Sequence, residues 1–86
     1  MKIILRKTAE LEPEVDNLPI GYTVRGTLFC DPVPGRRIVM LREERNGQAA
    51  LGLFRTSPLV AVHNSPWGRV FHTSRSVWEE VLHEGD

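Results

Sequence analysis

The chain has 86 residues, of which 41% are hydrophobic and 26% charged, so it can build one modest core and is too apolar to be disordered throughout. Its formal net charge is zero, which disfavours functions that depend on a strong overall charge. No apolar run approaches the roughly 18 residues of a membrane span, no signal-peptide pattern follows Met1, and the lone Cys30 cannot form an internal disulfide, so we expect a cytoplasmic domain without membrane contact.

Turn signals recur at short spacing and separate runs of apolar, aromatic and β-branched residues. This rhythm predicts a mainly all-β domain, a small barrel of five to six strands. Residues 1–20 would form an N-terminal extension or edge strand, and residues 21–86 the barrel. The predicted strands are Ile3–Arg6, Tyr22–Phe29, Arg37–Glu44, Ala49–Thr56, Leu59–His63, Arg69–Thr73 and Val77–Leu82.

The clearest local prediction is a hairpin at Asn46-Gly47, because Asn-Gly readily adopts the two positive φ angles of a type I′ turn. The register that follows pairs Met40 with Leu53 and puts apolar side chains on both faces of the hairpin. One face can line the core, and the other needs a cover, either a second copy in a homodimer or the N-terminal segment MKIIL. The candidate self-association residues are Ile38, Met40, Leu51 and Leu53.

The pattern F-x-T-S-x-x-V occurs twice, as FRTSPLV at 54–60 and FHTSRSV at 71–77. The simplest interpretation is one structural corner built twice, in which Thr and Ser hydroxyls bond to nearby backbone while Phe and Val plug the core. The alternative is a polar binding site, which we would place beside the second copy. With the tryptophan of the PWG loop, the candidate ligand or partner contacts are His72, Arg75, Trp78 and Trp67.

Two segments leave alternatives open. The loop NSPWG at 64–68 sets His63 and His72 on opposite faces, although a one-residue change in loop closure would bring them to one face. In TSRSVWEEVLHEGD, Ser76 and Glu79 form a capping box for a short helix, whereas alternation from Trp78 onward suits a final strand.

The order LPIGYTVRGTLFCDPVPG, RIVMLRE, LGLFRTSPLVAV and VFHTSRSVW resembles a family of small, mostly uncharacterised bacterial proteins, often encoded beside mobile DNA or gene cassettes. The likeness covers Leu18 to Trp78, with Leu59 and Trp78 standing where Val and Tyr are more usual. It implies an SH3-like barrel that ends in a strand, which favours a strand over a short helix or 3-10 turn at Val77–Leu82. It implies no known chemistry.

The neutral total divides into a basic body and acidic ends. Residues 21–75 hold eight arginines against three acidic residues, a net charge of +5, and the ends carry −5. Such a body can bind anions or be neutralised by its own termini. The candidate anion contacts are Arg36, Arg37, Arg42, Arg55 and Arg69.

No catalytic, metal or cofactor pattern emerges. The three histidines and Cys30 match no zinc spacing, and no Ser is visibly placed beside an oriented base. We therefore expect no enzyme and no cofactor. Two functions remain: a self-associating interaction module, a homodimer that binds a protein or small ligand, or a nucleic-acid-binding module in which the arginines contact phosphates while Trp67 and Tyr22 stack bases. The neutral charge favours the first.

Overall fold

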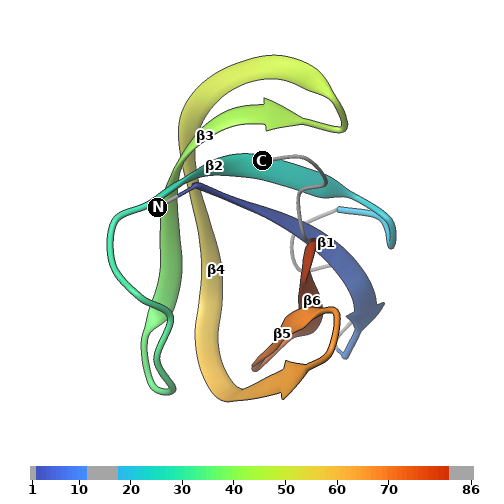
Figure 1. Cartoon of the computed structure of the whole chain (residues 1–86), viewed down its shortest axis with the longest axis vertical. Coiled ribbons are helices and arrows are strands. Elements are labelled where there is room, and N and C mark those ends of the chain that lie inside the picture. The colour runs from blue at the N-terminus through green and yellow to red at the C-terminus, as the bar shows by residue number, and fades with distance from the viewer. Residues whose placement is uncertain (1, 12–17, 82–86) are drawn as a thin grey trace.

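The computed structural model describes residues 2–11 and 18–81, and within them the chain is all-β, as predicted. The six strands are β1 (Lys2–Glu10), β2 (Thr23–Leu28), β3 (Arg37–Arg45), β4 (Gln48–Ser65), β5 (Gly68–Thr73) and β6 (Ser76–Val81). Each strand pairs antiparallel with the next, and β1 pairs with β6, which closes the barrel (Figure 1). No helix in this described part is long and apolar enough to cross a membrane.

The N-terminal residues form an integral strand rather than an extension or an edge strand. Ile3 of β1 pairs with Gly26 of β2, and Ile4 pairs with Val81 of β6. Alternation in KIILRK gives β1 one inward face, on which Ile3 and Leu5 are fully buried. The predicted boundary at residue 20 therefore cuts through the barrel, because the chain uses this strand to remove both sheet edges.

The Asn46-Gly47 turn is confirmed, but the register beyond it is shifted by one residue. Both turn residues have positive φ, and Arg45 pairs with Gln48. A bulge then sets Ala50 and Leu51 opposite the single Glu43, so that Arg42 pairs with Gly52.

The bulge separates the four residues that were predicted to share one face. Because a one-residue shift inverts every side chain, Met40 pairs with Phe54 inside the barrel, and Ile38 is buried there too. Leu51 and Leu53 point outward instead. The predicted common face was therefore wrong.

The two strands predicted at 49–56 and 59–63 are one long strand. β4 sweeps around the barrel (Figure 1) and exchanges partners at Pro58–Leu59: Arg37 of β3 pairs with Pro58, and Leu59 pairs with Thr73 of β5. Proline is tolerated at such a point because the ladder is interrupted there. The C-terminal ambiguity resolves as strand β6, and no helix or 3-10 turn occurs among the described residues. Leu82 lies outside them.

The loop closure decides between the two alternatives for the histidines. Ser65 pairs with Gly68 across a two-residue turn instead of a five-residue loop, and this one-residue change pairs Ala61 with His72 and His63 with Val70. Both imidazoles therefore lie on the same outer face, with ring centroids 4.9 Å apart.

Trp78 stands at the centre of the core. It is 1% exposed, and Tyr22 and Phe54 meet its indole edge-on at centroid distances of 6.4 and 5.4 Å. Lys7 is also buried: its ammonium pairs with Glu10 at 3.0 Å and donates to the Leu18 carbonyl at 2.8 Å. These contacts satisfy a charge that burial alone would strongly disfavour, and they fix Leu18 against the barrel.

We predict that Gly26→Ala destabilises the barrel. A Cβ at this position would overlap the backbone carbonyl of Leu41 on β3, and backbone cannot rotate away as a side chain can. The expected loss in the free energy of unfolding, measured by urea denaturation, is about 2–3 kcal/mol. Gly52→Ala is the matched control, since its Cβ would meet only the end of the Arg42 side chain, at 3.0 Å. Equal stability of the two variants would contradict the close approach of β2 and β3.

Candidate functional site

The two Thr-Ser segments are structural corners held by their threonine hydroxyls. Thr56 Oγ1 accepts from the Ile38 N–H at 3.1 Å and donates to the Ser57 carbonyl at 2.8 Å. Thr73 Oγ1 accepts from the N–H groups of Arg75 and Ser76, at 3.1 and 2.9 Å. The hydroxyls thus satisfy backbone groups where the chain leaves the ladder.

The apolar part of the corner prediction is half right. Phe54 and Phe71 are buried as expected, at 7% and 0% exposure. Val60 is 65% exposed, and Val77 is only half-buried. Leu59 and Trp78, one residue before and after those valines, fill the core instead, and the register irregularity between Leu59 and Ala61 leaves Val60 outside.

The two corners lie against each other in space. Leu59, just after the first corner, pairs with Thr73, and the Ser74 N–H donates to the Pro58 carbonyl at 3.1 Å. Together they line one pocket of about 280 Å³, which we call the corner pocket. Its lining residues are Leu18, Arg37, Phe54, Arg55, Thr56, Ser57, Pro58, Ser74, Arg75, Ser76 and Trp78.

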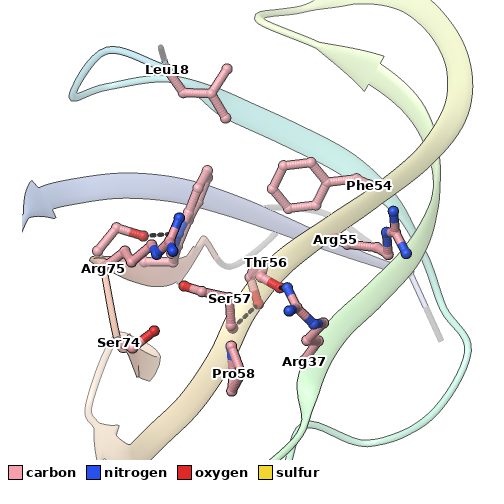
Figure 2. Close-up of a pocket in the computed structure, with 11 residues that line it drawn as sticks. Leu18, Arg37, Phe54, Arg55, Thr56, Ser57, Pro58, Ser74 and Arg75 are labelled. Carbon is pink, nitrogen blue, oxygen red and sulfur yellow. Dashed lines mark hydrogen bonds between the residues drawn. The ribbon is translucent and has the colours of Figure 1, made fainter. Parts of the chain in front are cut away.

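Charged and polar groups face one another across the corner pocket. Figure 2 shows Arg37 and Arg75 on opposite sides, with Ser57 between them and Ser74 on the Arg75 side, while Arg55 extends from the other side of β4, away from Arg75. One Arg37 nitrogen donates to the Thr56 carbonyl at 3.1 Å, which anchors that guanidinium and leaves its other donors available.

An apolar wall backs the polar groups. Phe54 and the edge of Trp78 form it, and the indole N–H is already used by Ser76 Oγ at 2.8 Å. The wall therefore offers contact area but no hydrogen-bond donor of its own.

Among the described residues, the charged side chains that line the corner pocket are all arginines, and no described Asp or Glu lines it. Each glutamate in the described part of the chain pairs elsewhere, with Lys2, Arg6, Lys7, Arg25 or Arg69. Arg37, Arg55 and Arg75 form no ion pair with the described residues. Positive charge without a nearby counter-charge stabilises a bound anion.

Two of the arginines predicted to contact anions have other partners. Arg42 folds across Gly52 and donates to the Ala50 carbonyl at 2.7 Å. Arg69 holds Glu80 through two bonds of 3.0 and 3.2 Å. This hydrogen-bonded pair raises the pKa of Arg69 and lowers the pKa of Glu80. Arg37 and Arg55 remain as candidates, and Arg36 lies next to them, its carbonyl accepting from Leu59 N–H at 2.9 Å.

The predicted ligand contacts are divided among three places. Arg75 and Trp78 meet at the corner pocket, whereas His72 lies beside His63 on the outer face of β5. Trp67, 79% exposed, occupies the β4–β5 hairpin tip and lines a separate cleft of about 570 Å³ with Arg6, Arg69, Glu79 and Glu80. Among the described residues no group of three or more metal-ligating side chains occurs, and His83 lies outside them.

The sequence raised the hydroxyls of Ser57 and Ser74 only as the alternative to structural corners, and it did not indicate Leu18 as a pocket residue. The signal for the two serines was the repeat itself, since two corners that tie a barrel together can share a cavity. Nothing in the local sequence around Leu18 indicated its place, which depends on buried Lys7. Comparisons with protein-family models, curated proteins and solved structures found no match to this chain.

We predict that Thr73→Val is more destabilising than Thr56→Val. The valine at 73 leaves the N–H groups of both Arg75 and Ser76 without their acceptor, whereas at 56 only the Ile38 N–H loses one. The expected losses in the free energy of unfolding, measured by chemical denaturation, are about 2–3 kcal/mol for Thr73→Val and about 1–2 kcal/mol for Thr56→Val. Thr73→Ser keeps the hydroxyl and should lose only about 1 kcal/mol with the methyl group. If Val and Ser at position 73 gave the same stability, the hydroxyl would not hold the corner.

We predict a pH-dependent contribution from the Arg69–Glu80 pair. Because the folded-state pKa of Glu80 is lowered, the pair stabilises the fold above the ordinary carboxyl pKa, and this stabilisation is lost as the pH falls through the folded-state value. Glu80→Gln should cost up to about 1 kcal/mol at neutral pH, and the difference from the parent chain should vanish in strong acid. Denaturation across pH measures this, and a constant difference would contradict the pair.

Proposed function

We propose that the protein is a non-catalytic binding module that takes a small anionic ligand in the corner pocket. The observation that carries this proposal is that Arg37 and Arg75 line opposite sides of a cavity that has no acidic residue among its described lining residues. Neither guanidinium has a carboxylate partner in the described part of the chain. An anion between them would supply the missing counter-charge.

The chemistry of the pocket selects an anion with an apolar body. Arginine binds carboxylate and phosphate oxygens through a planar fork of N–H donors, and the hydroxyls of Ser57 and Ser74, which line the same pocket, add further donors. Phe54 and the edge of Trp78 suit a ring or short apolar chain on the same ligand. At about 280 Å³ the cavity lies at the small end of ligand pockets, so it fits one small molecule better than a length of polymer.

The pocket favours binding over catalysis. A serine nucleophile needs a neighbouring base, and no His, Asp or Glu lines the cavity beside Ser57 or Ser74. His72 is close to Ser74 in sequence but lies on the outer face, beside His63.

Two finer expectations are part of the same proposal. The likeness to SH3-like barrels finds support in the strongly bent β4, which contributes to both halves of a small closed sheet. A cytoplasmic setting is supported by Cys30, which is exposed and unpaired as a thiol. The association with mobile DNA stays a prediction from the sequence resemblance.

Nucleic-acid binding is the second candidate function. It is favoured by Arg36, Arg37, Arg55 and Arg75, which gather around the corners without counter-charges among the described residues. It is disfavoured by the aromatic residues that would stack bases. Tyr22 is 6% exposed and packs edge-on against Trp78, and Trp67 lies at the opposite end of β5 from Arg75.

We predict that phenyl phosphate and benzoate bind the folded chain, with dissociation constants on the order of 1 mM or tighter, and that the neutral analogue benzamide does not. Backbone amide shifts in NMR titrations should map to residues 55–58 and 74–76. Arg37→Ala and Arg75→Ala should each weaken binding about tenfold, the loss of one charge-assisted hydrogen-bonded contact. Arg45→Ala, an exposed arginine at the far hairpin turn, is the matched control.

Two outcomes would overturn the proposal. One is binding that Arg37→Ala and Arg75→Ala leave unchanged, and the other is equal binding of benzamide. Titration with oligo-dT at several salt concentrations tests the second candidate: contacts from four arginines predict a slope of about −3 in log K against log salt. That slope, together with weak phenyl phosphate binding, would favour nucleic-acid binding as the function.

A further inference from the structure

A band of apolar side chains lies exposed on the outer face of the β3–β4 hairpin. Leu41 and Leu53 pair across the strands, Leu51 continues the band toward the turn, and these three are 39%, 65% and 77% exposed. Val39 extends it the other way, beside Phe29, whose N–H donates to the Val39 carbonyl at 3.1 Å. We call these five residues the hairpin face. Contiguous exposed apolar surface marks interaction sites in soluble proteins.

The described segments of the chain do not cover the hairpin face. MKIIL, the intramolecular cover considered from the sequence, is occupied in closing the barrel, with Ile3 and Leu5 inside it. A closed ring of strands also has no free edge to which a partner could add a strand. A partner must therefore pack against the outer surface itself.

The two ends of the hairpin face carry opposite charges. Glu43 stands opposite Leu51 across the bulge at the turn end, and Arg55 is the cross-strand partner of Val39 at the other end. Glu43 pairs with Lys2 at 3.0 Å, but both side chains are well exposed, so this ion pair is weak and easily exchanged. Arg55 forms no ion pair with the described residues.

This arrangement is self-complementary. Consider two copies packed face to face about a two-fold axis that lies in the interface, perpendicular to the strands. The strands of the two copies then run in opposite directions, so the Glu43 end of each copy meets the Arg55 end of the other. The same contact is then made twice, around leucines that are removed from water. An axis parallel to the strands would instead bring like ends together and leave the charges unmatched.

We propose that the hairpin face binds a second copy of this chain, in an antiparallel face-to-face homodimer centred on Leu41 and Leu53. The interface uses Leu51 and Leu53, as the sequence predicted, and excludes Ile38 and Met40, which are buried in the barrel. The corner pocket is a separate site, and only Arg55, at its rim, borders both.

Sedimentation velocity across a hundredfold range of concentration tests the dimer. The parent chain should shift from monomer to dimer with rising concentration, and Leu53→Glu should raise the dissociation constant at least about tenfold. Val60→Glu is the matched control, because Val60 is equally exposed at 65% on the same strand but lies in the part of β4 that pairs with β5 rather than β3. It should leave the dimer intact.

A charge exchange tests the orientation. Glu43→Arg and Arg55→Glu should each weaken the dimer, and the double variant E43R/R55E should recover affinity over either single variant. Leu53→Glu should retain its far-ultraviolet circular dichroism; if it does not fold, Leu51→Lys, at a 77% exposed position, takes its place.

The proposed dimer would be wrong if the parent chain stayed monomeric at all concentrations, or if the leucine variants left its dissociation constant unchanged. A double charge variant no better than the worse single variant would overturn the antiparallel arrangement. Phenyl phosphate binding by Leu53→Glu should match the parent chain, so failure of the dimer and failure of the anion site are told apart.

Discussion

The exchange of partner strands along β4, between Pro58 and Leu59, is the constraint on which the rest of this structure depends. A single strand of 18 residues serves two neighbours, β3 before the exchange and β5 after it, and so lets a short chain close a barrel. The regular ladder is interrupted there, and Thr56 supplies an acceptor and a donor for backbone groups at the interruption. The corner pocket lies at the same interruption, since Arg37, Thr56, Ser57 and Pro58 all line it.

The corner pocket owes its charge to where the acidic residues lie rather than to an excess of arginine. Arg6, Arg25 and Arg69 each have a glutamate within reach on the neighbouring strand, and Lys2 reaches Glu43 two strands away. The corners have no such neighbour: their short polar segments contribute hydroxyls and arginines only. A chain with no net charge can therefore present a local anion site, and total charge was a poor guide to it.

Local patterns predicted the strands, the Asn-Gly turn and the hydroxyl-held corners well, since each rests on a few adjacent residues. What failed was anything that depended on counting along a strand. One extra residue in β4 exchanged the faces of Leu51 and Leu53 with that of Phe54, and a hairpin turn of two residues instead of five brought His63 and His72 to one face. Bulges of this kind follow from the curvature of a small closed sheet, a global property that the hairpin sequence does not encode by itself.

The grouping of the candidate site residues could not be predicted from the sequence for the same reason, because it depends on how distant segments pair in the closed sheet. Arg37 and Arg75 are 38 positions apart in the sequence, and only the pairing of both corners around Leu59 and Thr73 brings them to one cavity. The repeated F-x-T-S pattern suggested two equivalent sites, whereas in the structure residues of both corners line the same pocket. Since barrel closure removes every strand edge, molecular recognition by the described part of the chain must use side chains on the outer faces or the corner pocket between its walls. Those two surfaces do not overlap except at Arg55, so a self-associated barrel can keep its pocket open to a ligand.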